Sequence, residues 1–171
     1  VTGVLDLTTT ELCDGLVGGV LSAGPERLEA AGRAGVPQVV SLGALDMVNF
    51  GPRDTVPERF EGRNLYVHNP TVTLMRTTPE ETAQLGRMIA EKLNGAAGPT
   101  VLFVPLRGVS LISTEGGVFH DAAADEALFA ALRDHLAEHV ELVELDLDIN
   151  DEGFAHAMAY RLIALTTEER S

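Results

Sequence analysis

Arg76 is the residue of this sequence best placed to contact an anion, because Thr77, Thr78 and a predicted helix start follow it directly. A guanidinium next to the free N–H groups of a helix N-terminus attracts phosphate or carboxylate. Thr77 and Thr78 add two hydroxyls to the same turn. The alternative is an ion pair between Arg76 and one of the 26 acidic residues; such a pair contributes only about 0–1 kcal/mol if it is exposed.

A second cluster of polar side chains follows the first strand-like run, at residues 4–8. Thr8, Thr9 and Thr10 place three consecutive hydroxyls beside a predicted helix start, which suits a phosphate or a carboxylate. The alternative is that they are ordinary strand-end and capping residues. The sequence contains neither a GxGxxG fingerprint nor a GxxxxGK[ST] loop, so any nucleotide site is of a non-standard kind.

Residues 43–51 form an unusual segment in which apolar and polar side chains alternate between two glycines, and we expect it to be a loop. Its apolar side chains are Met47, Val48 and Phe50. Gly43 and Gly51 allow close approach of backbone to a ligand, while Asp46 and Asn49 offer acceptors and donors for a sugar or a base. The alternative is an apolar loop that packs against a neighbouring domain or subunit. Either interpretation places the segment at an interface.

The candidates for acid–base chemistry are His68 and Asp46. His68 follows a strand-like run, and histidine is the side chain most often used for acid–base catalysis, although a lone histidine in such a position is usually structural. Neither a serine nor Cys13 lies in a nucleophile-elbow sequence, so covalent catalysis has no support. His135 and His139 lack the H-E-x-x-H pattern, and no metal site is expected.

The elements that position these residues alternate between strand-like and helical patterns. Such an order predicts an α/β three-layer sandwich with a mostly parallel sheet of five or slightly more strands, Rossmann/flavodoxin-like. The predicted strands are 4–8, 38–42, 65–67, 101–104 and 143–148. We expect the order 2-1-3-4-5, with ligand loops at the carboxyl ends of the strands, including Arg107-Gly108 and Asn150-Asp151. Thr78, Asp121 and Asn150 are the expected caps of the last three helices.

Length and charge set the class of protein. The 171 residues predict a single α/β domain, and because the chain enters a strand at once without an initial Met, we expect an excerpt of a longer protein. A formal charge of −14 argues against nucleic acid and anionic membranes as partners. No apolar run is long enough to span a membrane. The single cysteine fits a reducing compartment, and we expect a cytoplasmic location.

The segments at residues 6–11, 43–52, 74–78 and 150–155 resemble those of a widespread family of ATP-binding-domain proteins that includes a tomato protein conferring resistance to tobamoviruses. The resemblance runs over essentially the whole chain. It implies a two-part ATP-binding region of which this chain is the second, C-terminal part. ATP, with or without Mg, is the cofactor implied, and the missing N-terminal domain and a second copy in a homodimer are the partners expected.

Three functional hypotheses follow from these observations. The first is a half-site for ATP or another phosphorylated metabolite, with Arg76, Thr77 and the hydroxyls of residues 8–10 on phosphate. The second is an enzyme domain, hydrolase-like or ligase-like, that uses His68 or Asp46. The third is an assembly module in which residues 47–50 pack on a partner chain or domain.

Overall fold

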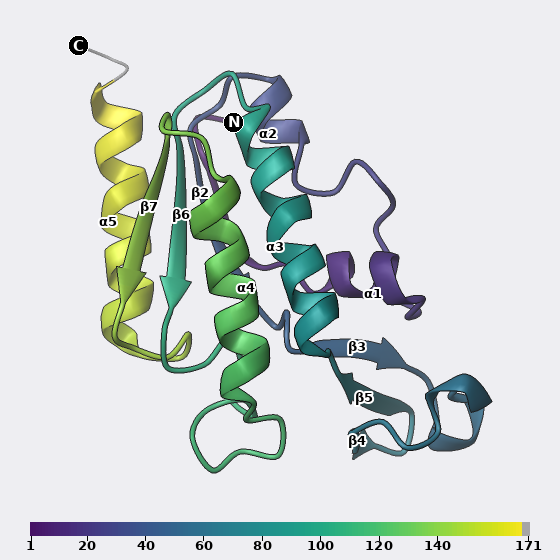
Figure 1. The fold of residues 1–171 in the computed structure, drawn as a ribbon. Coiled ribbons are helices and arrows are strands. Elements are labelled where there is room, and N and C mark those ends of the chain that lie inside the picture. Colours follow the sequence, from purple (N-terminus) through teal and green to yellow (C-terminus); the bar gives the residue numbers. More distant parts are fainter. Residues whose placement is uncertain (169–171) are drawn as a thin grey trace.

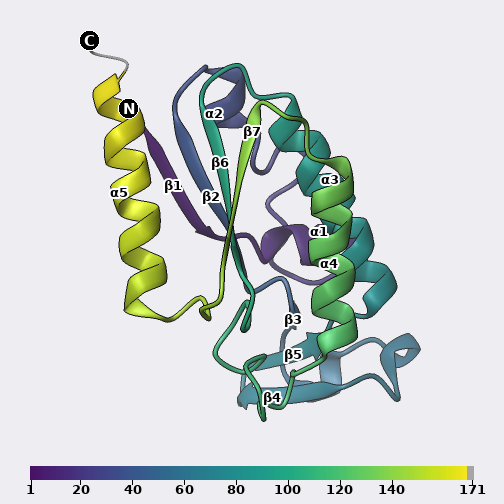
Figure 2. The ribbon, with the colours of Figure 1, turned by 60° about the vertical axis from the view of Figure 1, so that its left-hand side comes forward.

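The computed structural model describes residues 1–168, which form a parallel sheet with helices on both faces (Figure 1). The sheet contains four strands in the order β1-β2-β6-β7, namely β1 (Val4–Thr8), β2 (Gln38–Gly43), β6 (Thr100–Pro105) and β7 (Val140–Leu145). One face is covered by α1 (Glu11–Val17), α2 (Ala30–Arg33), α3 (Pro79–Asn94) and α4 (Ala122–His135). The other is covered by α5 (Glu152–Glu168) (Figure 2). The predicted α/β three-layer architecture is confirmed.

Two hydrophobic cores hold the three layers together. The larger core lies between the sheet and helices α1 to α4, and it includes Leu102, Leu85 and Leu128. The smaller core packs Phe154 and Met158 of α5 on the opposite face of the sheet. Strand β6 is buried along its whole length, as its continuous run of apolar residues predicts for a central strand.

The predicted number of strands in the parallel sheet and the predicted order of those strands are both wrong. Residues 65–67 do not join the parallel sheet but form part of β4 (Leu65–Asn69), which pairs with β5 (Val72–Arg76) in an antiparallel hairpin. The side chain of Asn69 accepts a hydrogen bond from the Thr71 amide at 2.9 Å and closes the turn. β4 therefore pairs with β5, the next strand in the chain, and not with a strand of the parallel sheet. The main sheet therefore has four strands rather than five, and β1 lies at its edge.

A second correction concerns residues 43–51, which are not a loop. A turn at residues 44–46 leads into β3 (Met47–Phe50), the third strand of the small sheet with order β3-β5-β4. Val48 and Phe50 are buried in the larger core, because this strand lies beneath α1 and the start of α3 (Figure 1). Two of the three apolar side chains that suggested an external interface are thus covered by the chain itself, while Met47 is half-buried.

Local helix signals are largely confirmed. The Thr78 hydroxyl accepts from the Glu81 amide at 3.2 Å, and the Glu81 carboxylate accepts from the Thr78 amide at 2.8 Å, a complete capping box. Asp121 caps α4. At α5 the capping side chain is Asp151, which accepts from the Gly153 amide at 2.7 Å, one residue after the expected Asn150.

The remaining regular elements are two short 3₁₀ helices, Arg53–Thr55 and Glu58–Phe60, between β3 and β4. None of the helices described over residues 1–168 combines the length and the hydrophobicity that crossing a bilayer requires.

Candidate functional site

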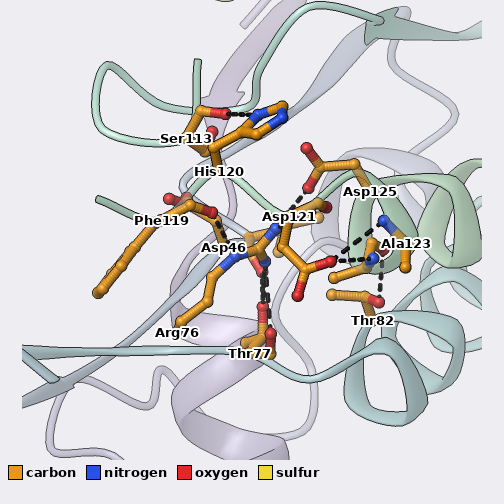
Figure 3. Close-up of polar contacts among 12 residues, drawn as sticks. Asp46, Arg76, Thr77, Thr82, Ser113, Phe119, His120, Asp121, Ala123 and Asp125 are labelled. Carbon is orange, nitrogen blue, oxygen red and sulfur yellow. Dashed lines mark hydrogen bonds and ion pairs between the residues drawn. The ribbon is translucent and has the colours of Figure 1, made fainter. Parts of the chain in front are cut away.

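Arg76 ends β5 with its side chain only 4 % exposed, and every N–H group of its guanidinium faces an acceptor in the protein (Figure 3). Nε donates to the Phe119 carbonyl at 2.8 Å, and Nη2 donates to Asp125 Oδ1 at 2.6 Å. Nη1 donates to the Thr77 hydroxyl at 2.9 Å. Longer contacts reach the carbonyls of Thr77 and Asp121. This geometry favours the ion-pair interpretation of Arg76 over direct contact with an external anion.

Asp46 lies beneath the connection between β6 and α4, and its side chain has no exposed surface. Its Oδ2 accepts from the Ser110 hydroxyl at 2.6 Å, whereas Oδ1 has no hydrogen-bond partner within residues 1–168. Burial raises the pKa of Asp46 to about 6, against the opposing effects of Ser110 and Arg76. Through this hydrogen bond the carboxylate holds the loop after β6 in place. Because the side chain has no exposed surface, it cannot contact a substrate in this conformation.

The hydroxyls of residues 8–10 are mostly engaged within the protein. Thr9 is buried and donates to the Ser41 carbonyl at 3.3 Å. Thr10 donates to the Met47 carbonyl at 3.3 Å and accepts from the amide group of Asn49 at 3.0 Å. Thr8 is exposed at the end of β1. Of the three, Thr8 is the most exposed, Thr10 is half-buried and Thr9 is buried.

Asn49 is buried and joins β3 to α1. Its side-chain amide donates to Asp14 Oδ1 at 3.2 Å, and its backbone amide donates to the same oxygen at 2.8 Å. Burial raises the pKa of Asp14, and the hydrogen bonds from Asn49 and Leu21 oppose this effect. The polar groups of Asn49 therefore serve the core rather than an open site.

Gly43, Thr77 and Thr78 also have structural partners. A Cβ at Gly43 would lie 2.4 Å from the Leu7 carbonyl oxygen, so glycine is required for the approach of β1 to β2. The Thr77 hydroxyl donates to the Leu45 carbonyl at 2.9 Å, and Thr78 caps α3.

His68 lies on β4 with an exposed side chain, and its ring centroid is 6.3 Å from that of Tyr66. It forms no contact with Asp46, the other acid–base candidate. No cluster of three or more His, Cys, Asp or Glu side chains arranged to hold a metal ion occurs among the described residues 1–168.

An open groove of about 830 Å³ lies at the carboxyl ends of β6 and β7, beside the first turns of α4. Its polar lining includes Arg107, Thr114, His120, Asp125, Arg133 and Asp148. Open parallel sheets bind ligands outside the carboxyl ends of their strands. The sequence pointed to Arg107 as part of a carboxyl-end loop, but Thr114, His120 and Arg133 were missed as site residues, because only the fold brings them together.

Arg107 differs from Arg76 in how it is held. Its guanidinium forms a two-bond ion pair with Asp146, at 2.7 and 2.8 Å, and both side chains are largely exposed. The hydrogen bond from Arg107 lowers the pKa of Asp146. Solvent-exposed pairs contribute little to stability, so Arg107 is free to exchange Asp146 for another anion, whereas the buried Arg76 is not.

The acidic side chains outnumber the basic ones around the groove. Four carboxylates line it, from Glu115, Asp125, Glu126 and Asp148. Asp125 is paired with Arg76, and Glu126 with Arg133 at 2.8 Å. Such a lining repels a bare polyanion and tolerates one whose charge is offset by a bound cation. His120 contacts the Ser113 carbonyl at 3.4 Å.

The parallel sheet, its two helical layers and the groove at the carboxyl edge define an α/β domain of the Rossmann/flavodoxin-like class. Residues 1–166 match the uncharacterised protein family UPF0261, C-terminal domain, and the chain belongs to that family.

Known relatives include bacterial and plant proteins. The chain is 60 % identical to a UPF0261 protein of Clostridium tetani over 162 residues, which cover 94 % of this chain and 40 % of that protein. Identity to a UPF0261 protein of Rhizobium meliloti is 55 % over 166 residues, 95 % of this chain and 42 % of the relative. Identity to the tomato ToMV resistance protein Tm-1(GCR237) is 40 % over 170 residues, 98 % of this chain and 22 % of the relative. The expected relationship to the protein family that includes the tomato resistance protein is therefore confirmed.

The relatives also bear on domain organisation. The chain spans about 40 % of the length of the first two bacterial relatives, and the family that it matches is a C-terminal domain. A further, N-terminal domain is therefore implied for the proteins of this family.

Proposed function

We propose that this domain supplies part of a binding site for a phosphorylated metabolite, ATP being the first candidate, and that its share of the site is the groove at the carboxyl ends of β6 and β7. The observation that carries the proposal is the position of this groove at the ligand-binding edge of a parallel sheet, with Arg107 beside it in an exposed and exchangeable ion pair. Arg107 takes the phosphate-binding role that the sequence suggested for Arg76.

The donor set of the groove fits a magnesium-bound phosphate better than a bare one. Mg²⁺ usually binds through one or two carboxylates together with substrate phosphates, and Glu115 and Asp148 are carboxylates of the lining. Magnesium would offset the charge that the acidic lining opposes. On this proposal Arg107 contacts a phosphate oxygen, and Thr114 offers a hydroxyl.

The other two sequence-based hypotheses are not developed further. The assembly role of residues 47–50 is not developed further, because Val48 and Phe50 are buried in the core. An enzymatic role for Asp46 or His68 gains no support, since Asp46 is enclosed and His68 lies apart from it on the small sheet. The homodimer and the cytoplasmic location stay predictions.

A thermal-stability measurement tests the proposal. The two-domain protein, this chain with its family's N-terminal domain, is heated with and without magnesium ATP at about 100 times its dissociation constant, where binding stabilises by about 2.7 kcal/mol. We expect the midpoint of thermal unfolding to rise by a few degrees, and R107A to lose about half of this shift or more. R87A is the matched control, because Arg87 is also exposed but lies on α3 outside the groove lining. An equal shift in R107A and R87A would refute the role of Arg107.

A further inference from the structure

The two edges of the parallel sheet differ in charge. On β7, Glu141 pairs with Arg161 at 2.6 Å and Glu144 pairs with Arg133 at 2.7 Å. Charged side chains on an edge strand discourage pairing with another chain. β1 carries a single charged residue, Asp6, so its edge has less of this protection than β7, which carries two.

Asp6 is also neutralised. Its carboxylate accepts two hydrogen bonds from the Arg27 guanidinium, at 2.6 and 2.7 Å. The chain has a formal charge of −14, but the one carboxylate of β1 is paired with an arginine, so β1 itself does not repel an acidic partner.

The side chains of β1 that alternate with Asp6 form an exposed apolar strip. Leu5 is 45 % exposed and Leu7 is 39 % exposed. Leu5 is in register with Val39, a member of the core beneath α5, so both leucines lie on the α5 face of the sheet. They are nevertheless only partly covered, because α5 is the one helix on this face of the described structure (Figure 2).

The helix α5 approaches the chain just before β1. A Cβ at Gly3 would lie 2.8 Å from Thr166 and 2.9 Å from Leu162. We call Leu5 and Leu7 the β1 strip.

The backbone of β1 is also available. The Val4 amide donates inward to the Pro37 carbonyl at 2.9 Å. Since successive N–H groups of a strand point to opposite sides, the Leu5 amide points away from β2, toward the free edge. An edge with unpaired backbone groups and apolar side chains is normally covered in the native protein.

We propose that the β1 strip docks the N-terminal domain of this family. More than half of the length of the bacterial relatives lies outside the region that matches this chain, and the matched region is the family's C-terminal domain. In such a relative, the preceding domain connects at the amino end of β1, the strand that carries Leu5 and Leu7 (Figure 2). This proposal does not depend on a ligand in the groove.

Hydrogen exchange of the Leu5 amide tests the docking. The exchange rate is measured in residues 1–171 alone and in the two-domain protein at equal, low concentration. We expect exchange to be at least tenfold slower in the two-domain protein, and the double variant L5E/L7E to restore the faster rate. V67E is the matched control, because Val67 is 53 % exposed on β4 of the other sheet.

Two results would overturn the proposal. Equal exchange of Leu5 in both forms would show that the N-terminal domain does not cover β1. Protection that depends on protein concentration would instead assign the edge to a second copy of the chain. If L5E/L7E unfolds, the milder pair L5S/L7S provides the same comparison.

Discussion

The Ser110 hydroxyl donates a 2.6 Å hydrogen bond to Asp46 Oδ2, which ties the loop after β6 to the turn after β2. The two residues are 64 positions apart in sequence. Asp46 is a buried carboxylate whose second oxygen has no partner within residues 1–168. This arrangement makes its ionisation unfavourable, and it has a consequence for stability.

The stability of the domain should fall as pH rises through the titration of Asp46. Because the pKa of Asp46 is about 6 in the folded protein and 3.8 is its ordinary value, the folded state binds this proton more tightly than the unfolded state. The stabilisation is fully present below about pH 4 and is lost as pH rises through about 6, by an amount on the order of 2–3 kcal/mol.

Urea unfolding of the wild type and D46N at several pH values between 4 and 7 measures this effect. The variant should lack the Asp46 contribution, so the difference in free energy of unfolding between the two proteins should change with pH. Asp14, whose pKa burial also raises, remains in both proteins and cancels, whereas the charge of Asp125 is one of the causes that raise the pKa of Asp46 itself. A difference that is constant across this range would contradict the assignment.

Arg76 should matter for folding rather than for ligand binding. Replacing it with Ala leaves Asp125 without its 2.6 Å partner and frees the Phe119 carbonyl, so we expect a loss of about 3–5 kcal/mol. Lys retains the charge but not the planar fork, and R76K should be intermediate. Urea unfolding, with R87A as the exposed control expected within about 0.5 kcal/mol, checks this. An R76A protein of unchanged stability that had lost ligand binding would return Arg76 to the ligand site.

Gly43 should be required for packing. In G43A the new Cβ would lie 2.4 Å from the Leu7 carbonyl oxygen and 2.8 Å from Ile149 Cδ1, so β1 must shift. We expect a loss of about 1–3 kcal/mol in the free energy of unfolding. G95A is the control, because its Cβ would have no neighbour nearer than 3.6 Å and Gly95 has a helical φ of −79°. Equal stability of G43A and wild type would show that the close approach is not needed.

Local signals in the sequence were sufficient for much of the fold. The capping box of Thr78 and Glu81, the Asp121 cap and the apolar run of β6 depend on residues near one another, and each forms as expected. The hairpin of β4 and β5 was missed because its strands are short and its first strand was assigned to the parallel sheet.

The candidate site was harder to predict, because its chemistry depends on distant partners. Residue type suggested Arg76 and Asp46 as ligand-contacting residues. Nothing near Arg76 in sequence indicates that Asp125, 49 residues later, would neutralise it. In the same way, an alternation of apolar and polar residues in 43–51 cannot distinguish an exposed loop from a strand covered on both sides. Arg107 looked ordinary until the fold placed it beside the groove.

Calorimetric titration of the two-domain protein with magnesium ATP tests the central claim most directly, because it measures the dissociation constant itself. A hydrogen bond to a charged group contributes about 1.5–3 kcal/mol, so R107A should weaken binding by about tenfold or more, while R87A should match the wild type. Removing magnesium with a chelator should weaken binding of the nucleotide in all three proteins, because the groove is lined by four carboxylates. Identical dissociation constants for R107A and wild type would contradict the account.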